Sequence, residues 1–237
     1  MTDRRLRVLT WNLHGAGRPD LGAVAALVRA VEPDVVGLQE VRRGQAERLA
    51  EGLGVTAAWS LKHLRYGPLV PLHAEGMALL TPGRSPVATT VLTPDARRWT
   101  SRRRIAQHVD LAAVGVRVVN THLDAHDARR RAPQADRLAR IVASRPPGPC
   151  VLLGDLNARV DEPEVFGPLT RAGLRDAWDD EAGGHPSAFT SPAAVPAQRI
   201  DHVLVTADVA VDDVRVPRGD WARWSDHLPV VADLTLG

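Results

Sequence analysis

The feature that most limits how this chain can fold is a repeated pattern in which an apolar run meets a short polar cluster. The runs are VLTWN, VVGLQE, VRVVNTH, VLLGDLNAR, RIDHVLV and SDHLPVVADL. Runs of this length are typical of strands. One polar strand end is ordinary, because Asp, Asn and Ser close turns and cap helices. Six such ends indicate a sheet-based fold whose loops carry a site at one edge.

The segments between these runs predict a layered α/β (α+β) fold with sheets inside and helices outside. Helical spacing of apolar residues and helix-stop residues indicate helices near residues 21–31 and 45–53. A third helix is expected to begin near Pro133, because proline suits the first turn of a helix, and a fourth to follow Asp161. Residues 55–119 contain short apolar runs broken by Pro and Gly, which favour antiparallel strands.

Bulk composition predicts one domain over residues 1–237. The chain is 44% hydrophobic and contains no long apolar run, and a domain of this length buries most of its surface. Its first residues enter a strand-like pattern without a signal-peptide pattern, so we expect a cytoplasmic location. Cys150 is the only cysteine, which excludes an internal disulfide and a thiolate metal cluster, and its apolar neighbours indicate packing.

Positive charge in this chain comes almost entirely from arginine. The formal net charge is only +2, and Lys62 is the only lysine. Mean charge therefore predicts little steering of a polyanion. Two clusters, RRWTSRRR at residues 97–104 and Arg129–Arg131, would suit phosphate groups, because a guanidinium is a fork-shaped donor. The alternative interpretation is that both clusters are solvated surface.

The polar residues at the strand ends favour metal-assisted phosphate chemistry. Carboxylate and amide oxygens are hard ligands suited to Mg²⁺ or Mn²⁺. A phosphoesterase needs such a cation, a base for water and donors for the charge that develops on phosphorus. Asp155 and Asn157 stand two residues apart, so in an extended segment both side chains would face the same way.

Six short motifs in a fixed order resemble the endonuclease/exonuclease/phosphatase superfamily of metal-dependent phosphodiesterases and phosphomonoesterases. They are TWN at 10–12, LQE at 38–40, NTHLD at 120–124, GDLNA at 154–158, RID at 199–201 and SDHLP at 225–229. The resemblance extends from Trp11 to Leu234. It implies a four-layer α-β-β-α sandwich, in which two mixed β-sheets pack face to face between helices.

This resemblance also implies a Mg²⁺ cofactor, for which Mn²⁺ can substitute. Glu40 would be the principal metal ligand. Asn12 and Asp226 would lie near the metal or the phosphate.

Five further residues receive catalytic roles from the resemblance. Asp201 would orient the imidazole of His227 and stabilise its protonated form. Either His227 or Asp155 would take the proton from the attacking water, and the sequence leaves this choice open. Asn157 and His122 would donate hydrogen bonds to the phosphoryl oxygens.

Other polar residues near the motifs have two interpretations. His14 and Asp124 would line the pocket or lie at the surface, and Glu75 would neighbour the metal side. His202 follows Asp201 in a strand and should face the other way, which predicts a packing role.

Substrate choice is the least constrained property. NTHLD is similar to the deoxyribonuclease and sphingomyelinase-like branches, whereas the abasic-site branch carries a tyrosine-containing segment there, and Tyr66 is the only tyrosine. The arginine clusters favour a phosphodiesterase or nuclease that acts on DNA or RNA. A phospholipid head group or a small soluble phosphate ester is the alternative substrate, without stable insertion into a membrane. A catalytically silent module that binds a phosphorylated ligand is the alternative from another class.

Overall fold

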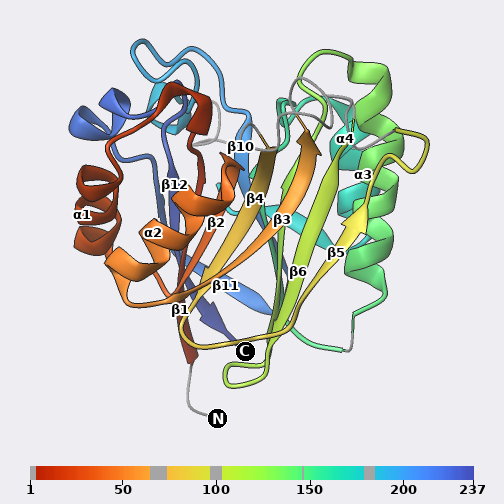
Figure 1. The fold of residues 1–237 in the computed structure, drawn as a ribbon. Coiled ribbons are helices and arrows are strands. Elements are labelled where there is room, and N and C mark those ends of the chain that lie inside the picture. Colours follow the sequence, from red (N-terminus) through yellow and green to blue (C-terminus); the bar gives the residue numbers. More distant parts are fainter. Residues whose placement is uncertain (1–3, 65–73, 97–102, 146, 179–184) are drawn as a thin grey trace.

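A computed structural model describes residues 4–64, 74–96, 103–145, 147–178 and 185–237. Within these residues the chain forms two mixed β-sheets of six strands each, with helices on both outer sides. Figure 1 shows α1 and α2 on one side of the sandwich and α3 and α4 on the other. The predicted α-β-β-α layering is therefore confirmed.

The first sheet has the strand order β11-β12-β1-β2-β4-β3. Its strands are β11 (Val209–Arg215), β12 (Val230–Leu236), β1 (Arg4–Asn12), β2 (Val35–Val41), β4 (Ala74–Thr81) and β3 (Thr56–Leu64). Its central strands β1 and β2 are parallel and are joined through α1 (Leu21–Val31), while the other pairs are antiparallel. Helix α2 (Arg43–Leu53) follows β2 and contacts α1.

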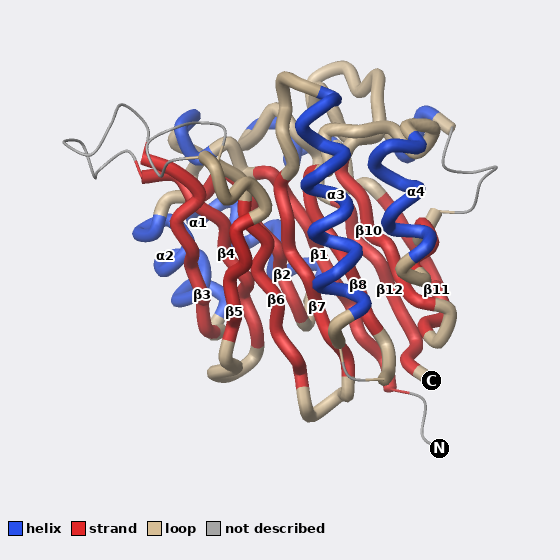
Figure 2. Tube along the Cα trace, turned by 90° about the vertical axis from the view of Figure 1, so that its right-hand side faces the viewer, coloured by secondary structure: helices blue, strands red, loops and turns tan. Residues whose placement is uncertain are grey.

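The second sheet repeats this plan with the order β5-β6-β7-β8-β10-β9. Its strands are β5 (Val87–Val91), β6 (Ile105–Leu111), β7 (Val116–His122), β8 (Cys150–Asp155), β10 (Asp201–Thr206) and β9 (Leu174–Asp176). The parallel pair β7 and β8 is joined through α3 (Ala128–Ala143), and α4 (Pro163–Arg171) follows β8. Figure 2 shows α3 and α4 lying over this sheet. Short 3-10 helices span Gly15–Gly17, Pro186–Ala188 and Gly219–Arg223.

Helix α3 begins earlier than the sequence predicts. Asp127 is its N-cap, and the carboxylate accepts a hydrogen bond from the backbone N–H of Arg129. Pro133 therefore lies inside the helix and does not begin it. The aspartate cap fixes the start because it satisfies a backbone donor that would otherwise be unpaired.

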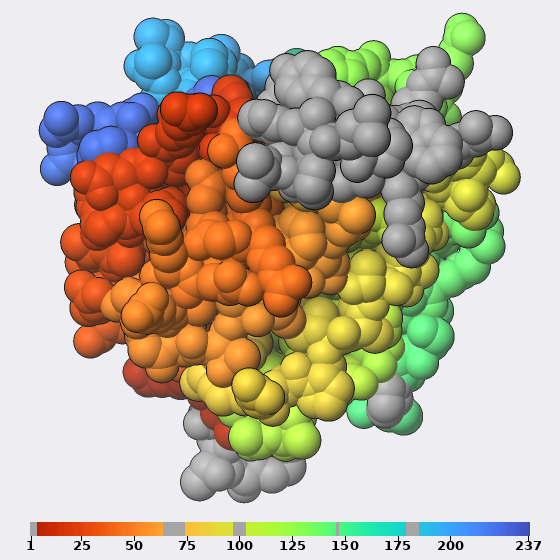
Figure 3. Space-filling model, viewed as in Figure 1, coloured from red at the N-terminus to blue at the C-terminus, as the bar shows by residue number. Residues whose placement is uncertain are grey.

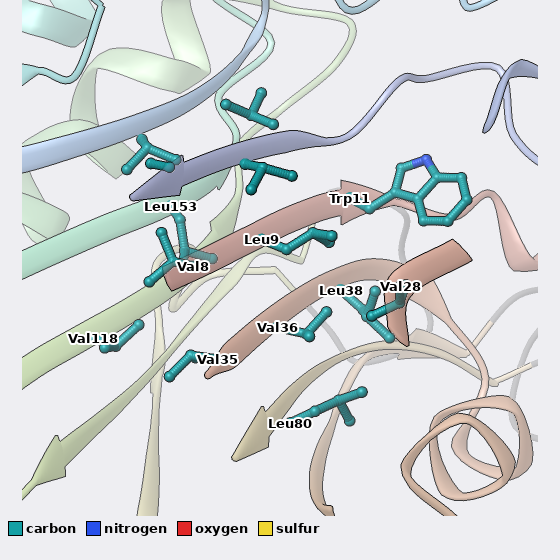
Figure 4. Packing of buried hydrophobic residues seen from close by; sticks show 14 of the residues in the cluster. Val8, Leu9, Trp11, Val28, Val35, Val36, Leu38, Leu80, Val118 and Leu153 are labelled. Carbon is teal, nitrogen blue, oxygen red and sulfur yellow. The ribbon is translucent and has the colours of Figure 1, made fainter. Parts of the chain in front are cut away.

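Two apolar clusters hold the layers together. The larger one fills the space between the sheets and extends under α1 and α2, and Figure 4 shows Leu153 of the second sheet beside Val8 of the first. The smaller one lies between the second sheet and α3 and α4, and it includes Cys150. Burial raises the pKa of the Cys150 thiol to about 12, which agrees with the predicted packing role.

The polar strand ends lie at one end of the sandwich. In the second sheet His122 pairs with Asp155 and Asp155 pairs with Asp201, so these three residues are neighbours across β7, β8 and β10. In the first sheet Asn12 pairs with Gln39 at the ends of β1 and β2. Figure 1 shows both chain termini at the opposite end. The register thus places the predicted residues together.

Candidate active site

Asn12 and Asp155 join the two sheets at the polar end of the sandwich. Nδ2 of Asn12 donates a hydrogen bond of 3.0 Å to Oδ2 of Asp155. Both side chains are buried, with Asp155 only 1% exposed. Nε2 of His122 lies 3.6 Å from the same carboxylate oxygen. The three residues therefore form one contact group, although their strands belong to different sheets.

Gly154 allows β8 to approach β7 closely just before Asp155. Its φ angle is +141°, a conformation that side chains rarely adopt, and an added Cβ would lie 2.0 Å from the carbonyl oxygen of Thr121. Glycine is required here because no side chain fits between the two backbones. The GD pair in the sequence thus sets the position of the carboxylate.

Asn157 does not continue the extended segment that the sequence predicts. Strand β8 ends at Asp155, and Asn157 has a left-handed φ of 48°. The backbone N–H of Asn157 donates to Oδ1 of Asp155 over 2.9 Å, which closes a tight turn. Its side-chain amide donates to the carbonyl of Leu123 over 3.3 Å. The hydrogen bond to the Asp155 carboxylate therefore favours a turn over a longer β8 strand.

His227 and Asp201 form the predicted pair. Nδ1 of His227 lies 2.8 Å from Oδ2 of Asp201, and that oxygen also accepts a 2.6 Å hydrogen bond from the hydroxyl of Thr190. Oδ1 of Asp201 is buried without a hydrogen-bond partner among the described residues. The sequence analysis missed Thr190, which lies eleven residues before Asp201 in an irregular segment.

Two further residues hold the loop that carries His227. The hydroxyl of Ser225 donates to the backbone carbonyl of Asn12 over 2.6 Å and accepts a hydrogen bond from the backbone N–H of His227. The indole of Trp11 donates to the carbonyl of His227 over 2.8 Å. These bonds fasten the SDH segment to the end of β1. Trp11 lies in the TWN motif and Ser225 in the SDHLP motif, so both residues could have been identified from the motifs.

The pKa values of Asp155 and His227 move in directions that suit proton transfer. Burial, together with the like charge of Asp201, raises the pKa of Asp155 to about 6. Burial opposes protonation of His227, but the carboxylates of Asp201 and Asp155 outweigh it and raise the pKa of His227 to about 10. Ligand atoms of these three residues lie within 4.8 Å of one another, a spacing compatible with a metal. Because a protonated imidazole is a poor ligand, we favour proton handling here.

A bulge in β2 directs Glu40 toward the second sheet. The pairing of β2 with β4 shifts between Leu38 and Val41, and Glu40 has a left-handed φ of 52°. Bulges of this kind re-aim side chains next to sites. Oε1 of Glu40 lies 3.9 Å from Nε2 of His122 and 4.0 Å from Nζ of Lys62.

The oxygen atoms of the acidic and amide side chains at this end of the sandwich are suitable ligands for a hard divalent cation. Among the described residues, no side chain donates a hydrogen bond to the partly exposed carboxylate of Glu40, so its oxygens are available as ligands. The amide oxygen of Asn12 adds an oxygen ligand of the same hard type. This set contains no sulfur, which favours Mg²⁺ or Mn²⁺ over a thiolate-bound metal.

Asp226, the third predicted metal residue, lies at the exposed rim. Its Oδ1 is 3.1 Å from Nδ1 of His14, and its side chain is 57% exposed. Figure 3 shows blue atoms from late in the sequence beside red atoms from early in the sequence, at the upper left of the molecule. In the described part of the chain, no hydrogen bond or ion pair joins Asp226 to Glu40, so a shared metal stays a prediction.

A buried positive charge lies beside His122, and sequence reasoning missed it. Lys62 in β3 is 1% exposed, forms an ion pair with Glu75 of β4, and places Nζ 3.4 Å from Nδ1 of His122. Arg104 is 3% exposed, and it interacts electrostatically with the carboxylates of this region. Burial lowers the pKa of Lys62, while Glu75 opposes this effect. In the sequence, the only indication of this buried charge was a single lysine within a strand-like apolar run.

Neither interpretation of the two arginine clusters holds for every member. Arg103 is buried and donates to the backbone carbonyls of Leu61 and Lys62, so with Arg104 it is neither solvated nor a free phosphate binder. Residues 97–102 lie outside the described residues. Arg131 is buried and donates to Glu162 over 2.8 Å. Burial of these guanidinium groups inside a folded layer is not visible in a linear charge run.

The remaining arginines of the second cluster border a cavity of about 370 Å³ beside the N-terminus of α3. Its lining includes Arg129, Arg130 and Arg137, together with Leu92 and Asp95. One hydrogen bond joins a residue that lines this cavity to the loop after β7. There the backbone N–H of Asp124, two residues after His122, donates to Gln134, which also lines the cavity.

Two residues near the motifs have structural roles. His202 is fully buried, with Nε2 2.9 Å from the carbonyl of Ala158 and Nδ1 beside Arg199 and Asp176, in agreement with the predicted packing role. Asp124 is buried and accepts hydrogen bonds from the backbone N–H groups of His126 and Asp127. These bonds shape the loop before α3.

The chain belongs to the Endonuclease/Exonuclease/phosphatase family, whose model matches residues 9–227. Members of this family are metal-dependent hydrolases that act on phosphate esters. The chain is 32% identical over 123 residues to the uncharacterized protein YbhP of Escherichia coli K12. That match covers 51% of this chain and 47% of YbhP, so it spans about half of each protein.

Three solved structures share the fold. An endonuclease/exonuclease/phosphatase from Bacteroides vulgatus has a TM-score of 0.81 at 22% identity, covering 99% of this chain and 100% of its own. A second, from Beutenbergia cavernae, has a TM-score of 0.76 at 27% identity, covering 99% and 72%. The mannosyl-6-phosphatase Bt3783 of Bacteroides thetaiotaomicron has a TM-score of 0.72 at 19% identity, covering 97% and 99%.

No helix among the described residues combines the length and the apolar character needed to span a bilayer.

Proposed function

We propose that this protein is a Mg²⁺-dependent hydrolase that cleaves a phosphate ester by in-line attack of water. The observation that carries this proposal is the contact group of His122, Asp155, Asp201 and His227, joined to the first sheet through Asn12. A carboxylate of raised pKa next to a protonated imidazole supplies both a base and a positive charge. A silent binding module needs neither.

The geometry supports Asp155 as the base that takes the proton from water. Its pKa of about 6 leaves it ionised yet basic near neutral pH. His227 is protonated at that pH, so it cannot accept the proton. Held by Asp201, the imidazolium of His227 would stabilise negative charge on the phosphoryl group as the water oxygen bonds to phosphorus and the leaving oxygen departs. His122 would donate a further hydrogen bond to the phosphoryl group.

Glu40 and Asn12 are the residues that would hold the metal, with Asp226 at the rim as the third predicted member. When bound, Mg²⁺ supplies charge neutralisation on a phosphate oxygen. Mn²⁺ is expected to substitute because it accepts the same oxygen ligands. Asn157, whose side-chain amide donates one hydrogen bond to Leu123, keeps a second N–H that could contact substrate.

We propose a nucleic-acid phosphodiester, in DNA or RNA, as the substrate. The support is the cavity bordered by Arg129, Arg130 and Arg137, which offers guanidinium groups to a neighbouring backbone phosphate. The position of His122 in the site supports the deoxyribonuclease and sphingomyelinase-like branches, whose NTHLD segment this chain shares. A single domain over residues 1–237, a cytoplasmic location and the absence of stable membrane insertion stay predictions.

A small phosphate ester or a phospholipid head group is the second candidate. Burial of Arg103, Arg104 and Arg131 removes three of the guanidinium groups that favoured a polymer.

The deciding experiment compares hydrolysis of bis(p-nitrophenyl) phosphate, p-nitrophenyl phosphate, single-stranded DNA, RNA and phospholipid vesicles. Each is assayed in Mg²⁺, Mn²⁺ and EDTA, with Asp155→Asn as the inactive control. Turnover of DNA or RNA that EDTA and Asp155→Asn abolish would support the nuclease. Turnover of p-nitrophenyl phosphate alone would favour the small-ester alternative. Binding without any product release would support the silent module.

The arginine-bordered cavity has its own test. We expect the triple variant Arg129→Gln/Arg130→Gln/Arg137→Gln to bind DNA more weakly and with a flatter salt dependence, because each lost phosphate contact reduces the salt slope by about 1. A matched variant is Arg215→Gln, on β11 of the other sheet. An unchanged slope in the triple variant would remove this cavity from the substrate path.

A further inference from the structure

The ion pair of Lys62 and Glu75 lies directly behind His122. Nζ of Lys62 is 3.4 Å from Nδ1 of the imidazole, and Lys62 is 1% exposed. Glu75 is also buried, and its carboxylate contacts the same ammonium group. The lysine and the glutamate come from β3 and β4 of the first sheet, whereas His122 ends β7 of the second. The contact therefore forms only across the sandwich.

The chemistry of the ammonium group determines which nitrogen of His122 carries the proton. A charged lysine has three N–H donors and no acceptor, so Nδ1 of His122 must accept. A neutral imidazole that accepts at Nδ1 is protonated at Nε2. Glu75 favours the charged state of Lys62, because a buried carboxylate stabilises a buried ammonium.

The contact with Lys62 also fixes the number of protons on His122. Because Nδ1 accepts from the ammonium group, the imidazole is neutral and has a single N–H. Nε2 lies 3.6 Å from Oδ2 of Asp155 and 3.9 Å from Oε1 of Glu40, so it faces the space between the two carboxylates.

We propose that Lys62 is a positioning residue that fixes His122 as the Nε2–H tautomer, so that the imidazole presents its one donor to a phosphoryl oxygen. The part concerning phosphoryl oxygen rests on the proposed function, whereas the tautomer does not. The opposite tautomer would turn a lone pair toward Asp155, Glu40 and the substrate oxygen, all of which carry negative charge. Lys62 excludes it, because an Nδ1–H would meet an ammonium that cannot accept.

The direct test is the tautomer of His122 in the wild-type protein. Imidazole ¹⁵N chemical shifts and long-range ¹H–¹⁵N couplings distinguish Nδ1–H, Nε2–H and imidazolium forms. The resonances are assigned by their loss in His122→Asn. We expect the neutral Nε2–H form near pH 7. An Nδ1–H or imidazolium form would overturn the proposal, whether or not any ester is hydrolysed.

A pair of variants tests whether Lys62 causes this tautomer. Lys62→Met alone would leave the buried Glu75 carboxylate unpaired, so the test protein is Lys62→Met/Glu75→Gln. Lys62→Arg alone is the matched control, because its guanidinium stays charged, can pair with Glu75 and has no acceptor. We expect Nε2–H in the control and a mixture of both tautomers in the double variant. A pure Nε2–H form in a folded double variant would overturn the role of Lys62. If the double variant does not fold, Lys62→Gln/Glu75→Gln replaces it, because an amide can either donate to Nδ1 or accept from it.

Kinetics connect the tautomer to the proposed function. With a substrate that the enzyme turns over, the double variant should lower kcat about 10- to 100-fold relative to Lys62→Arg with little change in KM, the effect expected when an orienting partner is lost. An unchanged kcat with a mixed tautomer would overturn the catalytic part of the proposal. Absence of turnover in every protein, with Nε2–H in the wild type, would contradict the proposed function and leave the tautomer assignment standing.

Discussion

The side-chain amide of Asn12 donates to the carboxylate of Asp155 over 3.0 Å, and this hydrogen bond joins strand ends from two different sheets. The pair of His227 and Asp201 also crosses between them, because His227 precedes β12 and Asp201 begins β10. The candidate site therefore exists only when the sheets are packed. The distances between its residues therefore depend on how the two sheets pack against each other.

Replacing the candidate base should remove turnover without unfolding the protein. We expect Asp155→Asn to lower kcat by about 10²- to 10⁴-fold, the usual contribution of a general base. The melting temperature and the near-ultraviolet circular dichroism should show a retained fold. An active variant would exclude Asp155 as the base and return that role to His227.

The pH dependence of wild-type turnover should report the same carboxyl group. Because the pKa of Asp155 is about 6 and the base must be ionised, kcat/KM should rise with pH through about 6. The profile is measured from pH 4.5 to 8 at saturating Mg²⁺. A limb centred near pH 4, the ordinary value of an aspartate, would show that burial does not control the base.

His227 should make stability depend on pH. Its pKa is about 10 in the fold, against about 6.5 in the unfolded chain, so its charge stabilises the fold in full below pH 6.5. That contribution is lost as pH rises from 6.5 to 10. We expect the melting temperature to fall over this window in the wild type and to fall less in His227→Gln. The exposed residue His185 provides the matched control, and His185→Gln should keep the wild-type decline.

Metal dependence should depend on Glu40. Glu40→Gln retains size but loses the charge that a divalent cation needs, so the Mg²⁺ concentration for half-maximal activity should rise by about tenfold or more. Glu47→Gln is the control, because Glu47 lies on α2 and pairs with Arg43 at the surface. Isothermal titration of Mg²⁺ gives a second readout. Equal titrations in both variants would remove Glu40 from the metal site.

Gly154 should not tolerate a side chain. Gly154→Ala would place a methyl group against the carbonyl of Thr121 at a φ that alanine rarely adopts. We expect it to lower the free energy of unfolding by more than about 1 kcal/mol and to displace Asp155. Gly44→Ala, in α2 where a Cβ meets nothing within 4 Å, should instead raise stability by up to about 1 kcal/mol. Urea titrations of both variants measure the difference.

Several properties could be predicted because they depend on residues close together in the chain. Apolar runs indicated the strands, and their polar ends indicated which edge carries the site. The ordered motifs brought Asn12, His122 and Asp155 into one hypothesis before any contact was known. Two local predictions were wrong. The start of α3 was expected near Pro133, and residues 155–157 were expected to be extended. In both places an aspartate side chain accepts a hydrogen bond from a nearby backbone N–H, as a helix cap in α3 and in a turn at Asn157.

By itself, the sequence determined the layered class and the residues at the strand ends, since strand periodicity and turn chemistry act over a few residues. Only the tertiary structure decided what surrounds those ends. The bulge at Glu40, the burial of Arg104 and the contact of Lys62 with His122 arise from packing between strands far apart in the chain. A buried charge is stable only beside partners that folding brings to it, so neither its place nor its partner is visible in a linear pattern.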